Sequence, residues 1–147
     1  MASVEIHPDR VVIRLSAAEK ALAFRKRDIV LDREAITSVL ITDDPWVWLR
    51  GVRSPGAHLP RTLALGTWRA SGGKDFIVVR SKRPAVVIDF DTEAVERRGD
   101  AESLDGSKAP FDAFARVVLS TRHAADVIKV LRGDDSTAVF EVGTSTS

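Results

Sequence analysis

The chain contains no cysteine, which excludes disulfide bonds, thiolate metal sites and cysteine nucleophiles. It also lacks asparagine, glutamine and tyrosine, and arginine outnumbers lysine by 16 to 6. We attribute these biases to genome composition. No apolar run approaches the roughly 18 to 20 residues that span a bilayer, and the N-terminus lacks the charged-then-apolar pattern of a secretory signal. We therefore expect a cytoplasmic protein without a transmembrane segment.

The remaining composition is that of an ordinary globular domain. The 147 residues are 44% hydrophobic and 29% charged, so the chain can bury one sizeable core. No repeat of fixed period is visible in the sequence. We predict a single domain over residues 1–133, followed by a C-terminal tail over residues 134–147.

Basic residues are concentrated in one part of the chain. The segment from Arg50 to Arg83 holds eight basic residues and one acid, Asp75, a net charge of +7, while the other 14 basic and 20 acidic residues give −6. Such asymmetry can attract an anionic partner. The alternative is that these cations scatter over both faces of several strands and form only a solvated surface.

Short β-branched and apolar segments separated by turn residues predict a mainly β fold. No alternation of strands and helices is present, which argues against a parallel sheet with helical crossovers. Residues 46–49 fit either a strand or a bulged continuation of the strand before them. The nearly continuous apolar runs at 76–79 and 85–88 indicate strands buried on both faces. The expected strands lie at both ends of residues 4–16 and at 28–31, 36–42, 61–69, 76–80, 85–90 and 111–120.

Two helices are expected. Ser16 and Glu19 have the spacing of a capping box, and alanine and leucine follow them, which favours a short helix. The second helix is amphipathic, with Thr121 as its cap and Gly133 as its end. Its apolar stripe has i, i+3, i+4, i+7 spacing and consists of Ala124, Val127, Ile128 and Leu131.

Three segments are expected to be irregular. Residues 51–60 contain two glycines and two prolines and predict an ordered, exposed loop. Residues 91–110 are charged and weakly apolar, which indicates a mobile insertion with a helical turn at 93–97. In the tail, residues 137–142 fit an edge strand, but truncation after Gly133 is expected to cost little stability.

Several of these stretches resemble a group of uncharacterised bacterial pleckstrin-homology-like (PH-like) proteins. The resemblance spans residues 4–132 and rests on "LSAAEK", on "RSPGAHLP" leading into "LGTWR", and on the closing "RHAADVIKVLR". It implies two near-orthogonal antiparallel sheets, forming a partial barrel, capped by a C-terminal helix. The family supplies no catalytic motif and no established ligand, and the insertion at 91–110 is longer than the family pattern implies.

Motifs for common chemistries are missing. The only Gly-Lys pair, Gly73-Lys74, has Trp68 where a phosphate-binding loop requires glycine. The nucleophile elbow and the zinc-protease motif are absent, and the three histidines lie far apart in sequence. We therefore expect no enzyme activity, no cofactor and no metal.

The sequence favours a non-catalytic binding or scaffold module. Its basic 50–83 region would meet an anionic lipid headgroup or an acidic protein partner. Positively charged side chains on adjoining strand ends would flank the 51–60 loop, with a histidine at its crown. The candidate binding residues are Arg50, Arg53, His58, Arg61 and Arg69.

Other functions remain open at this point. An enzyme site could form around His58, Asp89 and Asp91, since two carboxylates and an imidazole can act as acid and base. The three tryptophans could stack on nucleic-acid bases, but no basic residues interleave with them in a recognisable motif, so we expect no nucleic-acid partner. The sequence also leaves a homo-oligomer open.

Overall fold

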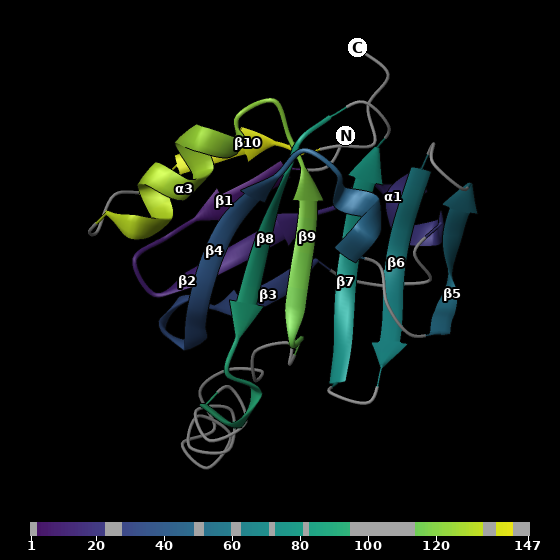
Figure 1. Cartoon of the computed structure of the whole chain (residues 1–147), viewed down its shortest axis with the longest axis horizontal. Coiled ribbons are helices and arrows are strands. Elements are labelled where there is room, and N and C mark those ends of the chain that lie inside the picture. Colours follow the sequence, from purple (N-terminus) through teal and green to yellow (C-terminus); the bar gives the residue numbers. More distant parts are fainter. Residues whose placement is uncertain are drawn as a thin grey trace.

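The fold is mainly β, and in the described part of the chain its strands form two sheets accompanied by the helices α1 (Ala17–Leu22) and α3 (Ala124–Arg132) (Figure 1). The four-stranded sheet lies behind part of the six-stranded sheet in that view, and the helix at residues 124–132 lies beside the strand at residues 36–42. In the computed structural model, the described residues are 3–22, 28–48, 52–59, 63–70, 73–80, 83–94, 114–133 and 138–142. In this part of the chain no helix is long and apolar enough to cross a bilayer.

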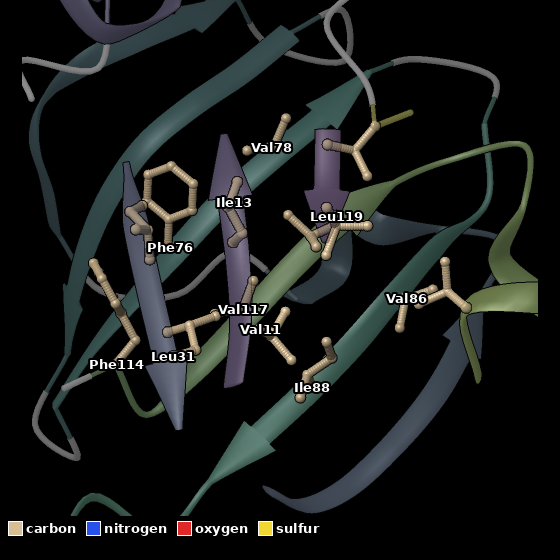
Figure 2. Close-up of a cluster of buried hydrophobic side chains, with 14 of the residues drawn as sticks. Val11, Ile13, Leu31, Phe76, Val78, Val86, Ile88, Phe114, Val117 and Leu119 are labelled. Carbon is tan, nitrogen blue, oxygen red and sulfur yellow. The ribbon is translucent and has the colours of Figure 1, made fainter. Parts of the chain in front are cut away.

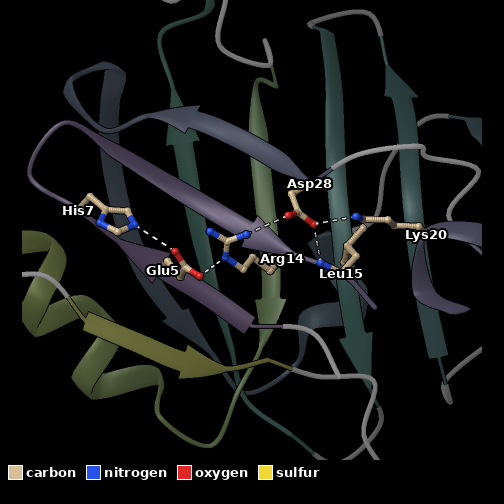
Figure 3. Close-up of polar contacts among 6 residues, drawn as sticks. All are labelled: Glu5, His7, Arg14, Leu15, Lys20 and Asp28. Atoms are coloured by element: carbon tan, nitrogen blue, oxygen red, sulfur yellow. Dashed lines mark hydrogen bonds and ion pairs between the residues drawn. The ribbon is translucent and has the colours of Figure 1, made fainter. Parts of the chain in front are cut away.

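The four-stranded sheet has the order β10-β1-β2-β3 and is antiparallel throughout. Side chains of a strand alternate between its two faces. On β1, Val4 and Ile6 are buried toward the other sheet, whereas Glu5 lies on the outer face with the ion pairs shown in Figure 3. The strands are β1 (Ser3–Ile6), β2 (Arg10–Arg14), β3 (Ile29–Asp32) and β10 (Ala138–Glu141).

The six-stranded sheet has the order β4-β8-β9-β7-β6-β5, and its β7–β9 pair is parallel. The expectation of purely antiparallel sheets is therefore wrong for this pair. β7 and β8 run in opposite directions with a gap of one strand between them, and β9 fills the gap. A strand inserted between two antiparallel strands must be parallel to one of them. The strands are β4 (Ile36–Thr42), β5 (Val52–Leu59), β6 (Leu63–Ala70), β7 (Gly73–Arg80), β8 (Ala85–Phe90) and β9 (Arg116–Ser120).

Both faces of the six-stranded sheet are buried at its centre, as the apolar runs predicted. The larger core lies between the sheets, where Phe76 packs against Phe114 with ring centroids 5.6 Å apart (Figure 2). The opposite face carries a second cluster, and Trp46 packs against it. That cluster consists of Ala64, Trp68, Ile77, Val79, Ala85, Val87 and Val118.

Two local predictions are wrong. Pro45–Trp48 forms a 3₁₀ turn instead of a strand, and this turn brings Trp46 onto the second cluster. The loop predicted over residues 51–60 is also wrong for residues 52–59, because Val52–Leu59 forms β5. β5 is an edge strand whose register shifts between Arg53 and Gly56. An edge strand with a bulge tolerates Pro55, which cannot donate a ladder hydrogen bond.

Both predicted helices are present. α1 (Ala17–Leu22) begins directly after Ser16, whose carbonyl accepts the Lys20 N–H at 2.9 Å. α3 (Ala124–Arg132) ends at Gly133, whose N–H reaches the Lys129 carbonyl at 3.0 Å. The stripe of α3 faces the core as predicted. Ala124 and Val127 are buried, and Ile128 and Leu131 are partly buried against the core between the sheets.

The cap of α3 differs from the prediction. Thr121 is not the N-cap, since the helix begins two residues later and its N-cap, His123, makes no side-chain capping hydrogen bond. The Thr121 hydroxyl instead accepts the His123 N–H at 3.1 Å. Thr121 is nearly fully buried, so its hydroxyl satisfies a backbone donor in the turn that precedes the helix.

The chain does not end with α3. β10 pairs with β1 along Ser3–Ile6, and Val142 just beyond it is 2% exposed. The description of residues 134–147 as a tail is therefore wrong for this strand, while the alternative of an edge strand is confirmed. Of the predicted insertion, residues 92–94 are helical. The remainder of the insertion lies outside the described residues.

Candidate functional site

The candidate basic residues are distributed along β5 and β6. Arg50 and Arg61 lie outside the described residues. Arg53 and His58 lie on β5, where they pair with Trp68 and Ala64. Arg69 is exposed on β6. Since residues advance by about 3.3 Å along a strand, Arg53 and His58 stand roughly 16 Å apart. The register pairs Val52, not Arg53, with Arg69, so Arg53 and Arg69 occupy alternate positions that belong to opposite faces of the sheet. His58 lies toward the other end of β5.

Lys74 joins Arg69 at one end of the sheet. The two residues occupy directly paired positions on β6 and β7, and paired positions of an antiparallel ladder share one face of the sheet. The Lys74 ammonium lies 4.8 Å from the centre of the Phe114 ring. Sequence analysis did not select Lys74. The signal was the glycine-rich hairpin after Ala70, because a two-residue connection between two strands fixes which of their positions pair.

Asp75, the one acid among residues 50–83, is only 1% exposed. Its position pairs with Arg116 on β9 and with Trp68 on β6. The described basic residues of the same segment behave differently. Arg69 is exposed, and the side chains of Lys74, Arg80 and Arg83 are partly exposed. In the described part of this segment, the charged side chains at the surface are therefore all cationic.

Asp89 belongs to an ion pair. One of its carboxylate oxygens accepts the Arg116 Nε–H at 2.7 Å, and the other accepts the Ser38 hydroxyl at 2.9 Å. His58 lies on β5, four strand spacings away in the sheet order, which is about 19 Å at 4.8 Å per spacing. Asp91 accepts the N–H groups of Glu93 and Ala94 at 3.1 and 3.3 Å. The sheet order thus separates His58 from both carboxylates.

A charged network covers the outer face of the four-stranded sheet (Figure 3). The Glu5 carboxylate accepts a hydrogen bond from the Arg14 guanidinium and pairs with His7 at 3.1 Å. Arg14 also reaches Asp28 at 3.3 Å, and Asp28 pairs with Lys20 at 3.4 Å. Sequence analysis missed this network, although the alternation of Glu5 and His7 with buried Val4 and Ile6 was its signal.

The network lowers the pKa of Glu5. The hydrogen bond from Arg14 is the largest cause, and it outweighs burial, which acts in the opposite direction. The imidazole of His7 lies within hydrogen-bond distance of the same carboxylate, at 3.1 Å.

We expect the contribution of Glu5 to stability to depend on pH. A carboxyl whose pKa is lower in the folded state stabilises the fold above its ordinary value, here 4.5, and loses that contribution as pH falls through the folded pKa. Glu5→Gln should lower the Tm by a few degrees at pH 6 and by much less at pH 3. Thermal unfolding followed by circular dichroism checks this. An equal effect of the substitution at both pH values would contradict the assignment.

Among the described residues, no three histidine, aspartate or glutamate side chains gather closely enough to hold a metal ion. In comparisons with known proteins, no family model, no curated protein and no solved structure matches the chain.

Proposed function

We propose that the protein is a non-catalytic binding module whose basic strands β5–β7 contact an anionic partner, with an anionic lipid headgroup as the first candidate and an acidic protein surface as the second. The burial of Asp75 carries this proposal. With Asp75 buried, the charged side chains that the described part of residues 50–83 presents at the surface are all cationic. The paired positions of Arg69 and Lys74 add to it.

We also propose that the chain belongs to the PH-like family. Two sheets around one core, with α3 beside β4, support this assignment. The parallel β7–β9 pair and the strand that follows α3 depart from the family pattern. A cytoplasmic location is part of the same proposal, and the absence of cysteine fits a reducing compartment.

The enzyme alternative finds less support in the geometry. Catalysis needs polar groups that converge on one pocket. His58 is separated from Asp89 and Asp91 by the order of the strands, and Asp89 is already engaged by Arg116 and Ser38. For this reason we favour the binding module.

Binding to vesicles tests the proposed function. We expect the full chain to cosediment with vesicles that contain phosphatidylserine or a phosphoinositide at low salt, and to be released at high salt. Exposed charge contacts contribute about 0.5–1 kcal/mol each, so the double change Arg69→Gln, Lys74→Gln should weaken binding by roughly fivefold to thirtyfold. The double change Arg122→Gln, Lys129→Gln is the matched control. It removes the same charge from exposed positions at the two ends of α3 and should have a much smaller effect.

Two outcomes would overturn the lipid form of this proposal. One is equal binding to neutral and anionic vesicles, and the other is binding that neither salt nor the Arg69 and Lys74 changes affect. If anionic vesicles do not bind at all, the same two double variants are compared for capture on an immobilised polyglutamate surface. If the protein does not bind polyglutamate either, the cations of β5–β7 form only a solvated surface and the proposed function is wrong.

A further inference from the structure

We propose that the hollow between β4 and α3 binds a small carboxylate that carries a short branched apolar group. The hollow has a volume of about 340 Å³, near the lower end of the range for small-molecule sites. It lies at the opposite edge of the six-stranded sheet from β5, so it is separate from the basic strands discussed above. Its walls are formed by Ile36, Thr37, Ser38, Val39, Leu131 and Arg132.

Arg132 provides the cationic group of the hollow. One of its terminal nitrogens donates to the Val39 carbonyl at 3.2 Å, which fixes the guanidinium across the edge of β4. A guanidinium has five N–H donors in a planar fork, so further donors remain for a ligand. A carboxylate matches this fork with two parallel hydrogen bonds. The geometry of Arg132 therefore favours a planar anion.

The other walls restrict the ligand further. The side chains of Ile36, Val39 and Leu131 pack against the core and present apolar surface to the hollow. The register shift between Ile36 and Ser38 is a bulge in β4, and bulges commonly interrupt strands beside binding sites. These walls favour an aliphatic group of about the size of a leucine or valine side chain.

The two hydroxyl groups argue against a doubly charged ligand. The Ser38 hydroxyl donates to the Asp89 carboxylate at 2.9 Å, and the Thr37 hydroxyl donates to the Asp89 carbonyl at 3.3 Å. Both donors are thus already used, and the Asp89 carboxylate stands behind them. The Asp89 charge is balanced by Arg116, so Arg132 is the one cation among the described residues of the lining and would leave half of the charge of a phosphate dianion unbalanced. A monocarboxylate with an apolar body fits the site better.

The same ligand chemistry has two sources, a free branched-chain acid and the C-terminal residue of another chain. NMR titration of the full-length protein with 4-methylpentanoate and with N-acetyl-L-leucine distinguishes them. We expect saturable shifts confined to residues 36–39 and 131–132. Tighter binding of N-acetyl-L-leucine would indicate a chain terminus, and tighter binding of 4-methylpentanoate would indicate a free acid. N-acetyl-L-leucinamide lacks the charge and should bind at least about tenfold more weakly than N-acetyl-L-leucine, because charge-assisted hydrogen bonds are the stronger ones.

Substitutions at the end of α3 complete the test. Arg132→Met should reduce the affinity for N-acetyl-L-leucine or 4-methylpentanoate about tenfold. Arg132→Lys keeps the charge but loses the planar fork, so its affinity should lie between those of Arg132→Met and the unaltered protein. Lys129→Met is the matched control, because Lys129 is exposed on the same helix and does not line the hollow. If Arg132→Met does not fold, the series of ligands on the unaltered protein decides the question. The proposal is overturned if no ligand saturates, if the amide binds as well as the acid, or if a folded Arg132→Met variant binds normally.

Discussion

Truncation of the chain after Gly133 should cost about 3–5 kcal/mol of unfolding free energy, because it removes two apolar side chains from the core. Val142 is 2% exposed and Phe140 is partly buried against the core between the sheets, and full burial of one such side chain is worth about 1.5–3 kcal/mol. The truncation also removes the ladder between β10 and β1 and leaves β1 as the sheet edge. A typical domain has only about 5–15 kcal/mol of net stability. Urea denaturation followed by tryptophan fluorescence measures the loss.

Two further variants localise the effect of this truncation. A chain that ends after Val142 keeps β10 and the buried Val142, and we expect it to lie within about 0.5 kcal/mol of the full chain. Val142→Ala in the full chain should reproduce part of the loss, since it removes buried apolar volume while the ladder remains. If the chain that ends at Gly133 unfolds at the same urea concentration as the full chain, β10 contributes nothing to the fold.

The sequence correctly predicted those elements whose residue pattern is local. The apolar runs on β7 and β8 and the stripe of α3 indicate buried faces without any knowledge of their partners. β5 was misassigned because Pro55 and Gly56 are local turn signals. A bulge at a sheet edge accommodates the same residues, and edge position is not a local property.

Features that join distant parts of the chain could not be derived in this way. The parallel β7–β9 pair depends on β9 entering a gap left by earlier strands. The candidate sites show the same limit. The basic segment was visible as charge, but the pairing of Arg69 with Lys74 required the register of a hairpin. The hollow depends on Arg132 reaching the Val39 carbonyl, 93 positions earlier in the chain, and no local pattern encodes that contact.

Arg33→Met should destabilise the fold by about 2–3 kcal/mol, although Arg33 lies in a short 3₁₀ turn next to β3. Its guanidinium donates to the His7 carbonyl at 2.9 Å and to the Val130 carbonyl at 2.9 Å. It has longer contacts to the carbonyls of Leu131 in α3 and of Gly133 just after it. The last four carbonyls of a helix have no partner within the helix, and the helix dipole places partial negative charge there. Arg33 therefore holds the C-terminal end of α3 against the turn between β1 and β2. Hydrogen bonds from a charged group contribute about 1.5–3 kcal/mol, more than neutral ones do.

The measurements for Arg33 separate loss of this contact from a general loss of charge. Arg33→Lys keeps one cation but cannot reach two carbonyls with a planar fork, so it should recover only part of the stability. Arg122→Met removes an exposed arginine near the other end of α3 and should change the unfolding free energy by less than about 0.5 kcal/mol. Hydrogen exchange in Arg33→Met should accelerate first in the last turn of α3, where the carbonyls lose their donor and the turn frays. Protection of that turn as high as in the unaltered protein would show that α3 is held by its apolar stripe alone.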